Sequence, residues 1–236
     1  LEDAVTGNLP ALSWIDPNFY DLGLVGSPSN DDHAPSDVFG GQELVFRVYN
    51  ALATGPRWDR TLLVVVYDEH GGFHDHVSPP EAPDEDPDRF GQYGVRVPAL
   101  IASPWIPPGL VSHTLFDHTS IIKTILERFC SAELEQRHGL KALGHWLERG
   151  HPHYLGRRVD AAIGLGELLT EPRPRPAPDR AALGALLAAH RAALAACAVQ
   201  SPPTVGAASR PLTDHQVHMV QATDHLRRHG LPSGQP

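Results

Sequence analysis

The segment "TLLVVVYDEHGGFHDHVSPP", residues 61–80, places two adjacent acids and paired glycines directly after an apolar run. Neighbouring side chains of a strand point to opposite faces, so Asp68 and Glu69 can share a ligand only where the strand ends. Gly71-Gly72 permits a turn there, because glycine tolerates positive φ. Paired carboxylates suit a hard or borderline divalent cation, and the pattern therefore indicates a metal site. A solvated strand end followed by a plain turn is the alternative.

Three histidines follow the acid pair. One short loop contains His70, His74 and His76. Asp75 can orient one of these imidazoles as a metal ligand. Alternatively, Asp75 and His76 brace the loop. The string "HDH" also suggests a zinc hydrolase of the metallo-β-lactamase type, with a water nucleophile. The order of residues disfavours this alternative, since Asp-Glu comes first and no further Asp-His follows.

The elements that position these groups are predicted from apolar patterns. The continuous, β-branched run from Thr61 to Tyr67 is typical of a strand buried on both faces, as in a parallel sheet covered by helices. A second strand is predicted around Pro98–Ser103, and a short one over Leu9–Ile15. Active sites of open α/β sheets lie outside the carboxyl ends of the strands, which is where the acid pair falls.

Two helices are predicted among these strands. Residues 37–53 carry a helical apolar stripe that ends before Gly55-Pro56. "FDHTSIIKTILERFC" predicts a capped amphipathic helix with Asp117 or Thr119 as N-cap. This capping explains much of the "DHTS" string that contains His118. The inner face is predicted to carry Ile121, Ile122, Ile125, Leu126 and Phe129. Strands and helices in this order favour an α/β fold.

The end of the chain differs in character. Residues 157–180 form a predicted proline-rich linker around "TEPRPRPAPD", and residues 181–236 a helical tail with an Ala-rich helix and a second helix over 212–230. The chain has 236 residues, 41 % apolar and 20 % charged, and a net charge of −9. These values favour a soluble globular protein and argue against nucleic acid as a partner. No apolar segment reaches the roughly 18 residues of a transmembrane helix.

Several motifs together resemble a known family. "YDEHGGFHDHVSPP", "GVRVPALIASPWI" and "FDHTSIIKTILERF", preceded by "LPALSWIDP", "DDHAPSDV" and "GQELVFRVYNAL", occur in the order found in the bacterial phosphoesterase family of non-haemolytic phospholipase C and acid phosphatase AcpA type. The resemblance runs from Leu9 to Phe129. It implies an alkaline phosphatase-like α/β sheet sandwiched by helices, with residues 1–156 as the C-terminal part of the phosphoesterase domain. It also implies hydrolysis of phosphoric esters by a hydroxyl nucleophile and a divalent metal ion.

The resemblance assigns roles to particular residues. Asp68 and Glu69 map onto metal ligands, and His33 of the "DDH" loop maps onto a catalytic histidine of the phosphate pocket. An imidazole can donate a hydrogen bond to a phosphoryl oxygen or protonate the leaving alcohol. By its residues alone, the loop reads as an Asp-rich turn that His33 caps. Further positions in the matching motifs are candidates to orient the metal ligands or line the phosphate pocket: Asp32, His70, Asp75, His76 and His118.

One part of the family pattern has no counterpart in the sequence. The family carries an "ENRSFDH"-like motif and a serine or threonine nucleophile upstream of "LPALSWIDP", and neither is found here. We therefore expect the nucleophile in a missing N-terminal segment of the same protein, and little activity from this chain alone. The alternative is an inactive truncated remnant or a binding module. The resemblance leads us to expect a phospholipid or phosphomonoester substrate and a secreted or periplasmic location.

Overall fold

The computed structural model describes residues 1–19, 29–33, 38–130 and 155–200. The chain divides into two compact units, each described by itself below. Of the described residues, the helical unit comprises those within 1–58 and 177–200, and the sheet unit comprises those within 59–176. The boundaries predicted at residues 156 and 180 remain a prediction.

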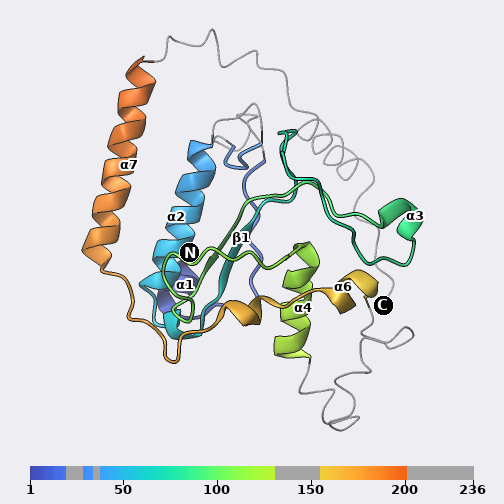
Figure 1. Ribbon diagram of the computed structural model, residues 1–236. Helices are drawn as coiled ribbons and strands as arrows, with labels where there is room; N and C mark the ends of the chain where they lie inside the picture. Colours follow the sequence, from blue (N-terminus) through green and yellow to red (C-terminus); the bar gives the residue numbers. More distant parts are fainter. Residues whose placement is uncertain (20–28, 34–37, 131–154, 201–236) are drawn as a thin grey trace, which may run out of the picture. The chain divides into compact units, whose positions relative to one another are not determined.

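The apolar run of the sheet unit forms strand β1 (Leu63–Val66), and the second predicted strand forms β2 (Ala99–Ala102) (Figure 1). The two strands pair antiparallel, with Leu63 opposite Ala102 and Val66 opposite Ala99. The prediction of a parallel sheet is therefore wrong for this pair. β-Branched side chains favour strands of either orientation, so composition could not distinguish the two.

The connection between the strands explains their orientation. A parallel pair needs a crossover, usually a full helix packed on the sheet. Here the only helix of the connection is α3 (Pro87–Phe90), a single turn. An antiparallel bridge between Glu81 and Gln92 holds the two arms of the connection together around α3. The chain thus goes out and returns as a long loop, and β2 runs back along β1.

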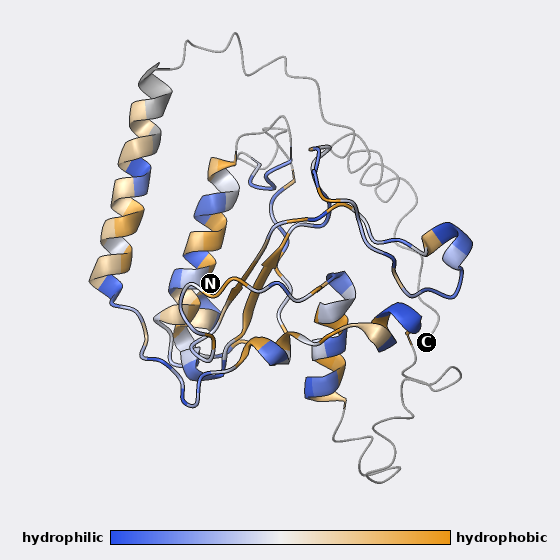
Figure 2. Ribbon diagram, in the orientation of Figure 1, coloured by the Kyte–Doolittle hydropathy of each residue, from blue (hydrophilic) through white to orange (hydrophobic). Residues whose placement is uncertain are grey.

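One face of the sheet packs against an apolar cluster of the same unit. Val64 and Ile101, which are paired, pack against a buried cluster of Ile106, Leu165 and Leu168. On the opposite face, the side chain of Leu100 is 64 % exposed. All four residues of β1 are half-buried, so the prediction of a strand buried on both faces is wrong. Both strands are coloured as apolar in Figure 2.

The capped helix is α4 (His118–Phe129), and Asp117 is its N-cap as predicted. The Asp117 carboxylate accepts from the Ser120 N–H at 3.1 Å, and the Ser120 hydroxyl accepts from the Asp117 N–H at 3.1 Å. This reciprocal pair forms a capping box, which satisfies backbone donors that a helix start would leave open. Two short elements, α6 (Arg157–Ala161) and the 3₁₀ turn η3 (Leu165–Leu168), pack against α4.

The predicted inner face of α4 is confirmed in part, because Leu126 is buried and Ile121 packs on the cluster of Ile106, Leu165 and Leu168. Ile122 and Phe129 are exposed, whereas Ser120, Lys123 and Leu126 are buried. These buried residues follow a three-residue spacing, which keeps them on one side of a helix. Lys123 tolerates burial because its ammonium donates to the Asp160 carbonyl of α6 at 3.0 Å. The prediction assigned the face by apolarity and therefore missed a buried lysine.

The helical unit contains α1 (Glu2–Thr6), α2 (Phe39–Ala53) and α7 (Arg180–Gln200), and both other helices pack on α2. The helices α2 and α7 confirm two predictions. Residues 9–15 form no strand, contrary to the prediction, and Trp14 is 76 % exposed. No neighbouring strand pairs with this segment in the described part of the unit, and a strand without hydrogen-bonded partners is not stable.

The described residues combine helices with a small sheet, as an α/β fold requires. Residues 170–179, the proline-rich stretch, contain neither helix nor strand, while residues 157–168 hold α6 and η3. The helix predicted over 212–230 lies outside the described residues. No helix of the described chain is long and apolar enough to span a membrane.

Candidate active site at the end of β1

Asp68 and Glu69 directly follow Tyr67, which makes the last backbone hydrogen bond after strand β1. The Tyr67 N–H donates to the Pro98 carbonyl at 3.2 Å, and the two acids after it are exposed. Asp68 Oδ1 accepts from the Glu69 N–H at 3.0 Å, and Glu69 Oε2 accepts from the Gly71 N–H at 2.7 Å. The local backbone thus orients both carboxylates at the strand end.

The turn after the acids has the geometry that the glycines predict. Gly71 has a φ of 66° and Gly72 a φ of 76°, both in the left-handed region that glycine adopts at little cost. The Phe73 N–H closes the turn on the His70 carbonyl at 3.1 Å, and His70 Nδ1 donates to the Phe73 carbonyl at 3.0 Å. The His70 ring is therefore engaged within the turn itself.

The donor set of the acid pair fits part of a divalent metal site. Carboxylate oxygens are the ligands that hard cations prefer, and both Asp68 and Glu69 face solvent. Such ions take about six oxygen ligands. Across the described ranges, no group of three or more His, Cys, Asp or Glu side chains is placed to hold a metal ion. A metal site that includes Asp68 and Glu69 therefore stays a prediction, and it needs further ligands besides these two.

His118 lies at the same strand end. It is the first residue of α4, and its Nε2 donates to the Tyr67 carbonyl at 2.9 Å. This contact joins residues that are 51 positions apart in sequence. Capping alone, which Asp117 and Ser120 carry out, does not account for it. The start of α4 and the acid pair are thus brought together as neighbours.

Asp75 is paired with Arg96, which is not among the site residues predicted from the sequence. Arg96 donates to both carboxylate oxygens of Asp75, at 2.7 and 2.8 Å, and the Val77 N–H donates to one of them at 3.1 Å. The Arg96 hydrogen bonds, followed by that of Val77, hold the pKa of Asp75 below its ordinary value. His76 Nδ1 is 3.6 Å from Asp75. This arrangement favours the bracing role for Asp75 and His76, while His74 is exposed.

A signal for Arg96 was present in the sequence. It stands in "GVRVPAL", shortly before β2, where a lone cation interrupts apolar residues. The antiparallel pairing returns this segment past the loop that follows β1. A parallel arrangement gave no reason to pair it with Asp75, so the error in strand orientation also hid this partner.

Arg158 of α6 ties the acidic loop between β1 and β2 to the rest of the sheet unit. Its guanidinium donates to Asp84 Oδ2 at 3.2 Å and to the Phe90 carbonyl, and it lies 5.2 Å from the ring centre of Tyr93. Burial raises the pKa of the Tyr93 phenol, and the negative charge of Asp117 adds to this shift. The phenol therefore stays protonated at neutral pH.

His33 and Asp32 belong to the helical unit. The loop turns on Asp31, whose Oδ1 accepts from the Ser29 hydroxyl at 2.7 Å and from the His33 N–H at 3.2 Å. Asp32 has a φ of 56°, and a Cβ added at Gly41 of α2 would lie 2.0 Å from its Oδ1. The loop therefore packs tightly on the start of α2. The strand-end acids belong to the other unit, so a shared site with His33 stays a prediction.

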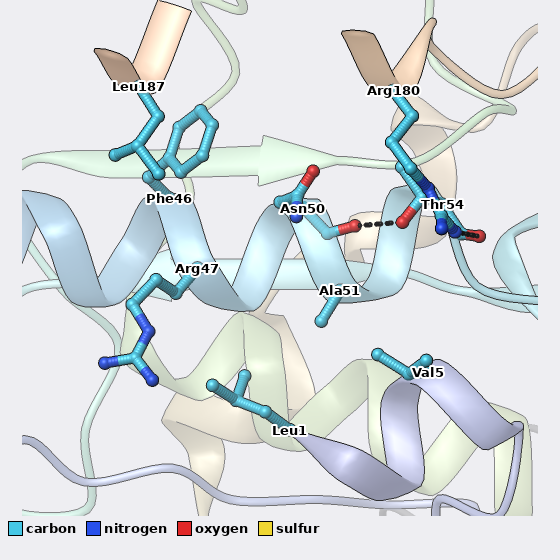
Figure 3. A pocket seen from close by; sticks show the side chains of 9 residues that line it. All are labelled: Leu1, Val5, Phe46, Arg47, Asn50, Ala51, Thr54, Arg180 and Leu187. Carbon is cyan, nitrogen blue, oxygen red and sulfur yellow. Dashed lines mark hydrogen bonds between the residues drawn. The ribbon is translucent and has the colours of Figure 1, made fainter. Parts of the chain in front are cut away.

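A separate pocket of about 300 Å³ lies in the helical unit, between α1, α2 and α7 (Figure 3). Its walls are largely apolar, with Val5, Phe46 and Leu187 among the lining side chains. Arg180 at its edge donates to the Thr54 carbonyl at 3.3 Å, which closes the end of α2. None of the predicted site residues lines this pocket. It is therefore not the candidate active site.

Comparison with known proteins identifies the class to which these motifs belong. The profile of the Phosphoesterase family matches residues 1–130, which is more than half of the chain. The chain therefore belongs to the Phosphoesterase family, and the predicted family is confirmed. The matched region contains the "DDH" loop, α2, both strands and the whole of α4.

Particular relatives are phospholipases C. The chain is 43 % identical over 146 residues to non-specific phospholipase C6 of Arabidopsis thaliana, covering 54 % of this chain and 28 % of that protein. It is 33 % identical over 153 residues to non-hemolytic phospholipase C of Pseudomonas aeruginosa, covering 54 % of this chain and 21 % of that protein. It is 34 % identical over 146 residues to phospholipase C B of Mycobacterium tuberculosis, covering 54 % of this chain and 26 % of that protein. The chain thus spans about a quarter of the length of these curated relatives.

Proposed function

We propose that the protein containing this chain is a divalent-metal-dependent phosphoric ester hydrolase of the phospholipase C or acid phosphatase type. The observation that carries the proposal is an exposed acid pair, turned outward by two left-handed glycines at the end of β1 in a chain of the Phosphoesterase family. Relatives with 33–43 % identity are named phospholipases C. Their names support a phospholipid or other phosphate ester as substrate.

In this proposal each candidate residue has a distinct task. Asp68 and Glu69 hold the divalent ion, which when bound neutralises charge on the phosphoryl oxygens and activates a hydroxyl. His33 donates a hydrogen bond to a phosphoryl oxygen or protonates the leaving alcohol. Arg96 and Asp75 brace the loop that follows the acids.

Other parts of the proposal concern the complete protein. We place the serine or threonine nucleophile in an N-terminal segment of the same protein that precedes this chain. We also propose that the complete domain is an alkaline phosphatase-like sheet sandwiched by helices, and that the protein is secreted or periplasmic. These statements are supported by the family and by the short length of the match relative to the relatives.

The zinc-hydrolase alternative is not proposed. It required the "HDH" string to act as a cluster of metal ligands. In the described structure, Asp75 is engaged by Arg96, and it forms no metal-holding group with His74 and His76. The remnant alternative is decided by the experiment below, because a remnant lacks activity in its complete form.

The experiment compares acid variants of the complete protein on phosphatidylcholine and p-nitrophenyl phosphate. We expect Asp68→Asn and Glu69→Gln to lower kcat/KM by about 10²- to 10³-fold, the usual effect of removing groups that stabilise transition-state charge. Asp88→Asn and Glu167→Gln, which change exposed acids on α3 and η3, are matched controls and should keep full activity. Activity that survives both site variants would overturn the proposal, and a complete wild-type protein without activity would indicate a remnant.

A further inference from the structure

Tyr67, the residue before the acid pair, is hydrogen-bonded through both its backbone N–H and its backbone carbonyl. The Tyr67 N–H donates to Pro98 at 3.2 Å, and the Tyr67 carbonyl accepts from His118 Nε2 at 2.9 Å. A backbone carbonyl can only accept, so Nε2 carries the proton in this contact. The first bond comes from the segment before β2 and the second from α4. Two different parts of the sheet unit therefore fix the backbone position of Tyr67, the residue directly before Asp68.

His118 is itself rigidly placed. It follows the N-cap Asp117, whose carboxylate is engaged by the Ser120 N–H and by the Thr119 hydroxyl at 2.6 Å. The Arg158 carbonyl oxygen of α6, 3.3 Å from the Thr119 hydroxyl, is a second acceptor for that hydroxyl. The capping box thus needs no contribution from the imidazole, which is left to reach the strand end.

We propose that His118 is a positioning residue for the acid pair, acting through the carbonyl of Tyr67. Beyond that carbonyl, short local bonds from the Glu69 and Gly71 N–H groups help to orient the acids. Loss of the His118 bond removes one of the two backbone hydrogen bonds described at Tyr67, and this loosens the backbone on which the local bonds of the acids depend. The inference rests on the proposed function only in taking Asp68 and Glu69 as the ligands that need this orientation.

Amide hydrogen exchange tests the positioning role without any metal. A glutamine side-chain amide can donate from the place of Nε2, whereas the shorter asparagine can imitate only Nδ1. We expect exchange of the Glu69 and Gly71 N–H groups to rise about tenfold in His118→Asn, as for the loss of one hydrogen bond. His118→Gln should exchange like wild type. His113→Ala, at an exposed histidine with no hydrogen bond in the described structure, is the matched control.

Metal affinity is the second readout, measured with Mn²⁺ by calorimetry on the complete protein. We expect His118→Asn to weaken Mn²⁺ binding about tenfold, in the range found for groups that orient metal ligands, and His118→Gln to restore it. Equal exchange at Glu69 and Gly71 in wild type and His118→Asn would overturn the positioning role. A wild-type protein that binds no Mn²⁺ would instead overturn the proposed metal site, while the exchange result would still decide the role of His118.

Discussion

Asp75 links the candidate site to the stability of the fold through its protonation. Its pKa lies below the ordinary value, first because of the hydrogen bonds from Arg96 and then because of that from Val77. An acid with a depressed pKa binds protons more weakly in the folded than in the unfolded chain. It therefore stabilises the fold above the ordinary Asp pKa of about 4, and this contribution is lost as the pH falls below that value.

The first prediction follows from this linkage. Between pH 6 and pH 3, wild type should lose more of its free energy of unfolding than Asp75→Asn, which has no carboxylate to protonate at that position. Urea denaturation at a series of pH values measures the difference. Asp88→Asn, an exposed acid on α3, is the control and should follow wild type. The same pH dependence in wild type and Asp75→Asn would show that the Arg96 pair does not stabilise the fold.

The second prediction concerns the glycines of the turn after the acid pair. An L-residue in the left-handed region costs about 1–2 kcal/mol, so Gly72→Ala should lower the free energy of unfolding by about that amount. Gly71→Ala should cost more, because its Cβ would also lie 3.1 Å from the Phe73 ring. Chemical denaturation gives both values.

A third glycine serves as the control for this pair. Gly94 lies in open space and outside the left-handed region. Alanine at such a position reduces the entropy of the unfolded chain and should stabilise by about 0.4–1 kcal/mol. Equal effects of Gly71→Ala and Gly94→Ala would contradict the turn geometry described here.

At the scale of elements, α4 connects capping chemistry with the site, because its first residue contacts the end of β1. The third prediction is that Asp117→Ala lowers the free energy of unfolding by about 1–2 kcal/mol through loss of the N-cap. Asp117→Asn should have little effect, since asparagine caps helices about as well as aspartate. Thermal unfolding followed by circular dichroism measures both. A loss of the same size in Asp117→Asn would mean that the charge of Asp117, not the cap, stabilises the helix.

The sequence predicted those elements whose signals are local. The cap of α4, the stripe of α2 and the β-branched run of β1 each lie within one segment. The relative orientation of β1 and β2 depends on the path of the connecting residues 67–98, and no local sequence pattern predicts this path. The failed strand over residues 9–15 has the same cause, because a strand requires a partner and its own composition cannot supply one.

The candidate site divides in the same way. Asp68, Glu69 and the glycine turn could be predicted because neighbours in sequence form them. The Arg96 partner of Asp75 and the contact of His118 with Tyr67 could not, since 21 and 51 residues separate the partners. At the scale of the whole molecule, His33 and the acids belong to different units, and their predicted meeting in one site depends on how the complete protein assembles.

The last prediction concerns the whole molecule. Only two metal ligands, Asp68 and Glu69, are proposed in the described part of the chain, which spans about a quarter of the length of its phospholipase relatives. If the nucleophile and the other ligands lie in another segment, these 236 residues alone should hydrolyse p-nitrophenyl phosphate no faster than Asp68→Ala of the same chain. The complete protein, assayed with the same metal ions, is the positive control. A metal-dependent rate from the isolated chain that Asp68→Ala abolishes would show that a nucleophile is present within it.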